Sequence, residues 1–155
     1  MKIWIDADSC PTRIREIVVK ASEREHIKSL FVANREVPIP SSDFSCTVRC
    51  GKEEGAADNH IIRHAGPGDL VITRDIPLAE QLVRKGIVVL NDRGTVYTEE
   101  NVGERRSERD FMAGLRAQGI LEQGKSRFSP REVRHFANAL DRELSKLRNT
   151  PDRGD

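Results

Sequence analysis

The sequence predicts an α/β protein with a mostly parallel sheet, and two observations support this fold class. Short apolar segments alternate along residues 1–100 with segments whose apolar residues recur at helical spacing, which is the pattern of βαβ units. The segment 70–73, Leu-Val-Ile-Thr, has almost no polar alternation, as expected for a strand buried on both faces of a sheet. From about residue 103 two helical segments follow with no strand between them, so we predict an α/β sandwich with a helical C-terminal extension.

The individual elements follow from local patterns. Alternation or short apolar runs predict strands at 2–6, 30–33, 46–50, 70–73 and 87–90. Helical spacing predicts helices over 11–25, where Pro11 suits the first helical position, from 55–57 to about 66–68, and from Pro77 to the closing Gly86. Phe111 and Leu115 mark the first C-terminal helix, and apolar residues from Val133 to Leu147 mark the second.

The length of 155 residues suits one domain, which we place at 1–148 including the helical extension 103–148, with a frayed tail at 149–155. The chain is polar, with 37% hydrophobic and 33% charged residues, yet its apolar runs indicate a packed core.

No run approaches the roughly 20 apolar residues that span a bilayer, and an acid follows the start too soon for a secretory signal. Three cysteines form no paired framework, so we expect a cytoplasmic protein without disulfides.

The net charge of +1 gives no direct indication of a nucleic-acid ligand, because such proteins often have a strongly basic balance. The charge is distributed unevenly, however. Residues 1–100 carry a net charge of −2 and residues 101–155 a net charge of +3. The positions of the acids are therefore more informative than the total.

Five aspartates are expected at one edge of the sheet, outside the carboxyl ends of the strands, where ligands bind in open parallel sheets. Asp6 and Asp8 follow the first strand, Asp75 follows the strand 70–73, and Asp92 follows the strand 87–90. Asp58 lies in the first turn of the helix before the strand 70–73. Clustered carboxylates repel one another, and a divalent cation such as Mg²⁺ removes that penalty. The alternative for each acid is an ordinary helix N-cap.

Four motifs stand out along the chain: Asp6-Ala7-Asp8-Ser9-Cys10-Pro11, Gly55-Ala56-Ala57-Asp58, the segment 68–79 and Asn91-Asp92-Arg93-Gly94. They resemble the YaiI/YqxD family of bacterial proteins, which in turn resembles the PIN-like and NYN group of nuclease domains. The resemblance implies a three-layer α/β/α sandwich with an acidic Mg²⁺ or Mn²⁺ site. By this resemblance Asp6, Asp58 and Asp75 are the catalytic acids that hold the metal, and Asp8 and Asp92 are further metal ligands.

Arginines near these acids are candidate contacts for a phosphodiester backbone, since a guanidinium group can hold phosphate through two hydrogen bonds. We assign substrate binding to Arg13, Arg74 and Arg93, together with Thr73. With few aromatic residues for base stacking, binding to RNA would be dominated by the backbone. The alternative for these arginines is a solvated helix face.

The sequence thus favours a metal-dependent nuclease-like domain that hydrolyses phosphodiester bonds in RNA. Two alternatives stay open. One is a catalytically inactive module of the same fold that binds RNA or protein. The other is an aspartate-based phosphatase with Asp6 as the nucleophile, because Asp6-x-Asp8 after a first strand resembles the opening motif of haloacid-dehalogenase-type phosphatases. Cys10 at a predicted helix start is either a thiol with a lowered pKa or a small, partly buried side chain.

Overall fold

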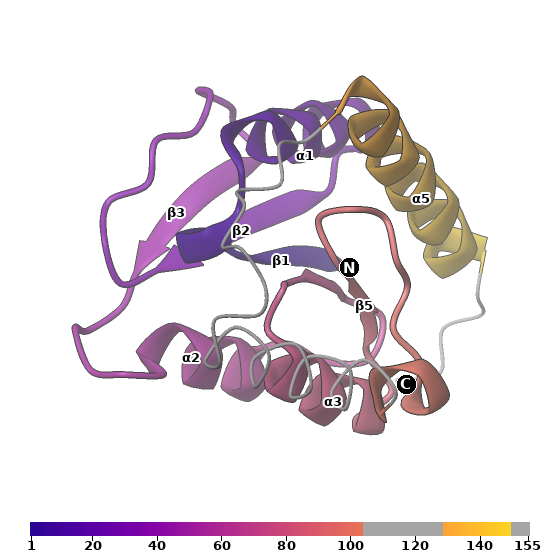
Figure 1. Cartoon of the computed structure of the whole chain (residues 1–155). Coiled ribbons are helices and arrows are strands. Elements are labelled where there is room, and N and C mark those ends of the chain that lie inside the picture. The colour runs from indigo at the N-terminus through magenta and orange to yellow at the C-terminus, as the bar shows by residue number, and fades with distance from the viewer. Residues whose placement is uncertain (104–128, 150–155) are drawn as a thin grey trace, which may run out of the picture.

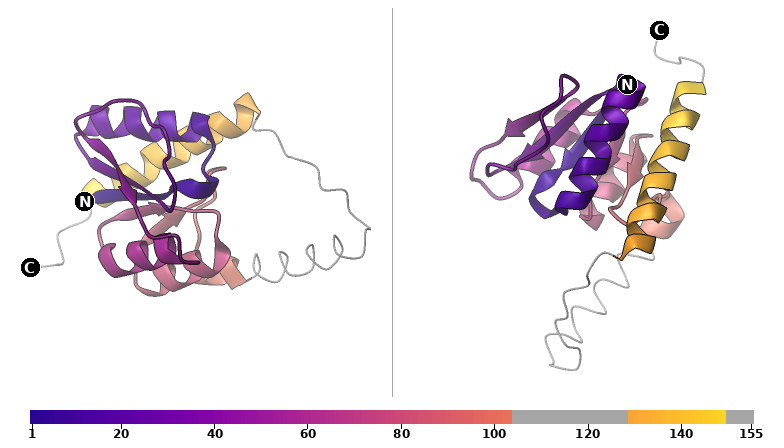
Figure 2. Two further views of the ribbon diagram at one scale, coloured as in Figure 1. Left: turned by 90° about the vertical axis from the view of Figure 1, so that its left-hand side faces the viewer. Right: turned by 90° about the horizontal axis from the view of Figure 1, so that it is seen from above.

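The computed structural model describes residues 1–103 and 129–149, and it has the predicted three-layer α/β/α architecture (Figure 1). The strands are β1 (Lys2–Asp6), β2 (Lys28–Ala33), β3 (Ser45–Arg49), β4 (Leu70–Ile72) and β5 (Val88–Leu90). The helices are the short 3-10 helix η1 (Ala7–Ser9), α1 (Thr12–Glu25), α2 (Ala56–His64), α3 (Ile76–Arg84) and α5 (Pro130–Asn149). Helices α1 and α5 cover one face of the sheet, and α2 and α3 cover the other (Figures 1 and 2).

The five strands form one sheet in the order β3-β2-β1-β4-β5, with every neighbouring pair parallel. After β1 the chain builds β2 and β3 on one side, then returns to build β4 and β5 on the other side. In the register of the sheet Ile5 lies opposite both Phe31 and Ile72. The strand order therefore reverses between β1 and β4, and their carboxyl ends flank the position where open α/β sheets bind ligands.

The sheet separates two hydrophobic clusters. Ile3 and Ile5 of β1 point to the face under α1 and α5, and the intervening Trp4 points to the face under α2 and α3. Residues of β4 divide in the same way, with Leu70 and Ile72 on one side and Val71 on the other. Both faces of β4 are buried, which explains why this strand shows no polar alternation in the sequence.

Helix α5, predicted as part of a C-terminal extension, completes the layer that α1 begins. Its residues Phe136, Leu140 and Leu144 are buried in the same cluster as the central strand. Arg24 of α1 pairs with Asp141 of α5 at 2.5 Å. Burial of three large apolar side chains stabilises this contact by about 5 kcal/mol before entropic costs, so α5 belongs to the core of the domain.

Most predicted boundaries agree with the structure to within one or two residues. Pro11 is the N-cap of α1 instead of its first helical residue, and α3 begins at Ile76, one residue before the predicted start. Residues 99–103 are already helical, before the predicted change at 103. The helix marked by Phe111 and Leu115, and the tail beyond 149, lie outside the described residues. Within the described parts of the chain, no helix is both long and apolar enough to cross a membrane.

Candidate functional site

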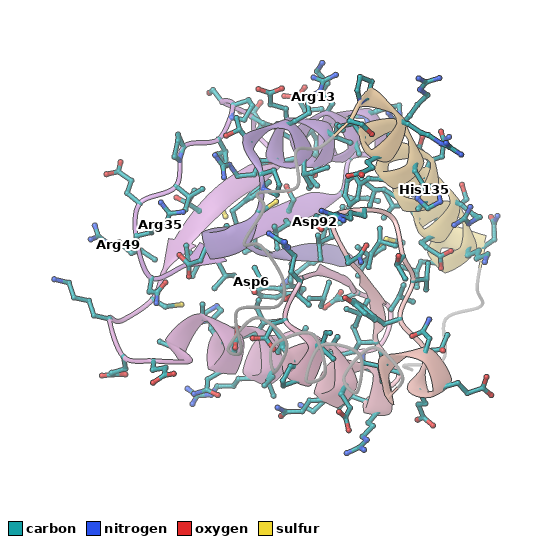
Figure 3. The ribbon with its side chains drawn as sticks, viewed as in Figure 1. Asp6, Arg13, Arg35, Arg49, Asp92 and His135 are labelled. Atoms are coloured by element: carbon teal, nitrogen blue, oxygen red, sulfur yellow. The ribbon has the colours of Figure 1, made fainter. Side chains whose placement is uncertain are left out.

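Four carboxylates from three separate segments of the chain line one pocket at the carboxyl edge of the sheet. Asp6 is the last residue of β1, and Asp8 lies in η1 directly after it. Asp58 lies in the first turn of α2, and Asp75 is the N-cap of α3. The pocket has a volume of about 460 Å³, and its other lining residues are Asn34, Gly55, Ala57 and Arg74. We call it the acid pocket; Asp6 is labelled near the centre of Figure 3.

Asp6 is held in place by a buried hydroxyl group. Thr73, one residue after β4, donates its hydroxyl to Asp6 Oδ2 at 2.9 Å, and the hydroxyl oxygen of Thr73 accepts the backbone N–H of Asp75 at 3.0 Å. This contact joins the carboxyl ends of β1 and β4 at the point where the strand order reverses. Burial raises the pKa of Asp6; the Thr73 bond opposes the rise, whereas Asp75 and Asp8 add to it. Thr73 therefore orients one of the pocket acids and is itself buried.

Asp75 has the structural role that the N-cap alternative predicted. Its Oδ1 accepts the backbone N–H of Leu78 at 2.9 Å, which caps the first turn of α3. The residue still lines the acid pocket. Capping and a place in the pocket are thus compatible for this side chain.

Asp8 is anchored by the segment that leaves β2. Its Oδ2 accepts the backbone N–H of Asn34 at 3.2 Å, and its Oδ1 lies 3.5 Å from Arg35 Nε. Arg35 also donates to the backbone carbonyl of Asp8 at 3.0 Å. The charge of Asp8 is therefore partly compensated, unlike that of a carboxylate surrounded only by acids.

Asp58 is the pocket acid with the most perturbed protonation. Burial raises its pKa from the ordinary 3.8 to about 6, with further contributions from Asp6, Asp75 and Asp8. Its position in the first turn of α2 opposes this effect, because the helix dipole favours negative charge there. At pH 7 Asp58 is therefore mostly charged in the absence of a cation, and it takes up a proton as the pH falls toward 6.

Asp92 follows β5 at the same edge of the sheet, but it does not line the acid pocket. Its side chain is only 4% exposed, and its Oδ2 lies 3.3 Å from Nε of Arg74, which does line the pocket. Burial raises the pKa of Asp92, and the guanidinium groups of Arg74 and Arg93 oppose the rise. Asp92 is thus placed to orient Arg74, and the structure does not bring it together with the four pocket acids.

Of the three predicted substrate-binding arginines, only Arg74 lines the acid pocket. Arg13 is exposed on α1 and pairs with Glu16, one helical turn further along, at 3.2 Å. Arg93 lies in the turn after β5, pairs with Glu132 of α5 at 3.8 Å, and lines a different pocket.

Cys10 has a buried thiol. Burial raises its pKa to about 12, and the charge of Asp92 adds to the rise. The alternative in which the helix start lowers the pKa of this thiol is therefore wrong, because the loss of solvent outweighs the effect of the helix dipole. Cys10 is a small core side chain.

The four carboxylates of the acid pocket supply oxygen atoms of the type that hard divalent cations bind. The raised pKa values of Asp6 and Asp58 indicate negative charge that burial and the neighbouring carboxylates oppose, and a cation would relieve it. Among residues 1–103 and 129–149, however, no three His, Cys, Asp or Glu side chains form a group that could hold a metal ion directly. Mg²⁺ is commonly held by only one or two carboxylates and keeps several waters, so such binding does not require a group of three ligands.

Two pocket features were missing from the sequence prediction. Asn34 lines the pocket directly after β2, and Arg35 binds Asp8. The rule that selected the acids, a polar residue after an apolar strand, also selects Asn34. It was overlooked because only carboxylates were considered.

Comparison with known proteins places these observations in a family context. The sequence model of the family described as "Uncharacterized BCR, YaiI/YqxD family" matches residues 4–146. A UPF0178 protein of Myxococcus xanthus is 47% identical over 150 residues, covering 97% of this chain and 98% of the relative. A UPF0178 protein of Treponema pallidum is 49% identical over 147 residues, covering 95% and 83%. No solved structure matches the chain.

Proposed function

The chain belongs to the YaiI/YqxD family, and we propose that it is a metal-dependent nuclease that hydrolyses phosphodiester bonds in RNA at the acid pocket. The observation that supports this proposal is the convergence of Asp6, Asp8, Asp58 and Asp75 on one pocket at the reversal of the strand order. The resemblance of this family to PIN-like and NYN nuclease domains supports the same reaction.

The chemistry requires a cation of the Mg²⁺ or Mn²⁺ type, which would lower the pKa of a bound water and stabilise the leaving oxygen. The residues of the chain provide its surroundings. Thr73 fixes the rotamer of Asp6, so that one carboxylate oxygen stays at the end of β1. Asp58 at the start of α2 and Asp75 at the start of α3 contribute further negative charge. Asp58, whose pKa of about 6 leaves it mostly charged at neutral pH, adds negative charge that a bound cation would offset.

Arg74 is the residue best placed to contact the phosphate. Its side chain is 51% exposed and lines the acid pocket, while Asp92 pairs with it from the buried side. An arginine held in this way offers its remaining N–H donors to the non-bridging oxygens of a phosphodiester. It would also reduce the repulsion between the anionic substrate and the pocket acids.

The first test is calorimetric titration of Mn²⁺ into the metal-free protein. We expect binding in the micromolar to millimolar range for the wild type, and at least about tenfold weaker binding for Asp6→Asn and Asp75→Asn, a loss of about 1.4 kcal/mol each. Both substitutions preserve shape, and asparagine also caps helices well. Asp43→Asn, which changes an exposed loop acid, is the matched control. A wild type that takes up no Mn²⁺ at millimolar concentration would refute the proposal.

The second test is cleavage of a labelled single-stranded RNA with Mn²⁺ or Mg²⁺. Shortened products that disappear with EDTA and with Asp6→Asn are the expected result. The absence of any group of three metal-binding side chains among the described residues favours one other candidate, a module that binds without hydrolysis. RNA binding without products, under conditions where Mn²⁺ binds, would establish that candidate instead. Covalent phosphate on Asp6 would establish the phosphatase.

A further inference from the structure

A second and larger pocket lies between the turn after β5 and the N-terminal half of α5. Its volume is about 860 Å³, far more than one phosphate group occupies. It is lined by the turn residue Arg93 and by Ser129, Arg131, Glu132, Arg134 and His135 at the start of α5. We call it the arginine groove.

The charge of the groove favours an anionic ligand. Among the described residues that line it, three arginines face one glutamate. Glu132 lies 3.8 Å from Arg93 and compensates part of that charge, whereas Arg131 and Arg134 are exposed one helical turn apart. The positive end of the dipole of α5, a helix of 20 residues, adds to the field.

The groove is a fixed feature of the fold. Asn91 shapes the turn, because its Oδ1 accepts the backbone N–H groups of Arg93 and Thr95 at 2.9 and 2.8 Å. Nδ1 of His135 lies 2.7 Å from the carbonyl oxygen of Arg93. Since a carbonyl only accepts, Nδ1 carries the proton and Nε2 is the remaining polar atom of the ring. Gly94 lets the two segments approach, as a Cβ there would lie 2.8 Å from atoms of His135.

One ion pair and the turn after β5 link the groove to the acid pocket. Arg74 lines the acid pocket and pairs with Asp92, whose neighbour in the chain, Arg93, lines the groove. In the view of Figure 3, Asp92 lies between Asp6 of the acid pocket and His135 of the groove. An extended polyanion lying in the groove would therefore reach the acid pocket past Arg74.

We propose that the arginine groove binds the phosphodiester backbone of single-stranded nucleic acid and guides it toward the acid pocket. The guiding role rests on the proposed function, whereas binding itself does not. Arginine side chains and a helix N-terminus recognise phosphate without reading bases, so affinity depends steeply on salt and weakly on sequence.

The test measures fluorescence anisotropy of a labelled RNA of about 12 nucleotides, and of its DNA counterpart, with the full-length protein in EDTA. For Arg131→Gln/Arg134→Gln we expect binding to be roughly 25-fold weaker at about 0.1 M salt, and the slope of log K against log salt to fall by about 1.4 for two lost phosphate contacts. Lys20→Gln/Arg63→Gln removes two exposed charges outside the groove and should change affinity by no more than about twofold.

Two further variants make the result specific to the groove. Glu132→Gln removes the opposing charge and should tighten binding by about fivefold. Arg131→Lys/Arg134→Lys keeps both charges and should retain most of the affinity, which excludes misfolding as the cause of a loss. If the control double variant loses as much affinity as the groove variant, or Glu132→Gln weakens binding, the assignment is wrong. Displacement of the RNA by polyglutamate of equal charge would show an acidic protein ligand instead.

The two proposals fail separately. Binding to the groove in EDTA without cleavage in Mn²⁺ supports the groove and overturns the nuclease. Hydrolysis of a small phosphodiester such as bis(p-nitrophenyl) phosphate, with no loss of RNA affinity in Arg131→Gln/Arg134→Gln, supports the reaction and overturns the groove. Equal affinity for RNA and DNA means that the groove does not read the 2′-hydroxyl.

Discussion

Replacing Asp58 by asparagine should stabilise the metal-free protein at neutral pH while weakening its affinity for divalent cations. In the folded protein the pKa of Asp58 is raised from 3.8 to about 6 by burial and by three neighbouring carboxylates. The folded state therefore holds the proton more tightly than the unfolded state. The stability that this proton provides is complete below about pH 3.8 and is lost as the pH rises through 6.

The magnitude follows from that shift and from the exposure of the residue. A shift of about two pKa units in a fully buried group corresponds to roughly 3 kcal/mol. Asp58 is only half-buried, so solvent screening reduces this penalty to about 1.5 kcal/mol. The dipole of α2 favours the charged form by about 0.5 kcal/mol. The net gain from Asp58→Asn above pH 7 is then about 1 kcal/mol, or about 2 to 4 °C in Tm for a domain of this size.

The assay is thermal unfolding of the wild type and of Asp58→Asn between pH 4 and 8, in EDTA and again with Mn²⁺. We expect the variant to melt higher at pH 7.5, the difference to vanish near pH 4, and Mn²⁺ to raise the Tm of the wild type more than that of the variant. Asp43→Asn controls for the loss of one surface charge. A variant that is less stable at pH 7.5, or a difference that does not change with pH, would refute the assigned electrostatics.

Three other substitutions or reactions test the structure around the site. Thr73→Val removes a buried hydroxyl that both donates and accepts a hydrogen bond. We expect the free energy of unfolding, measured in urea, to fall by about 2 kcal/mol and to be largely recovered in Thr73→Ser. A valine variant as stable as the wild type would contradict the contact. Gly94→Ala places a Cβ 2.8 Å from atoms of α5 at a φ of +89° and should lower the free energy of unfolding by about 3 kcal/mol. Gly86→Ala, with a φ of +79° and open space around it, should lower it by about 1 kcal/mol. Equal losses of stability would mean that the turn and α5 do not touch. Alkylation of the folded protein at pH 8, read out by mass spectrometry, should label the exposed Cys46. Cys10 should stay unmodified, because it is buried and its pKa is about 12. Preferential labelling of Cys10 would show that its thiol is reactive.

The sequence rule that located most of the pocket acids has a clear physical basis and a clear limit. In a parallel sheet all carboxyl ends lie at one edge, so polar residues after apolar segments gather there whatever the strand order. The rule therefore found Asp6, Asp8 and Asp75. It also selected Asp92, because the order of the strands is not visible in one sequence. In the structure β5 is an edge strand separated from β1 by β4, and Asp92 is buried against Arg74.

Side-chain partners were beyond sequence analysis for a related reason. Helical periodicity predicted α5 and the buried Phe136 and Leu140, but not the surface that they cover. Proximity in the sequence placed Arg13 near the acids, whereas the structure pairs it with Glu16 on the same helix. The helical repeat of apolar residues identifies which residues share a face of a helix. Only the packing of the layers decides what that face contacts.

The four pocket acids do not carry equal weight in the functional argument. Asp75 caps α3, Asp6 accepts the Thr73 hydroxyl, and Asp8 anchors the segment after β2. Each of these contacts stabilises the fold, so the presence of each of these three acids has a structural explanation that needs no ligand. Asp58 accepts no comparable hydrogen bond among the described residues, and its charge is opposed by burial and by the other three acids. A residue that destabilises the metal-free protein and has no such structural contact is best explained by a cation, which makes Asp58 the residue on which the nuclease proposal most depends.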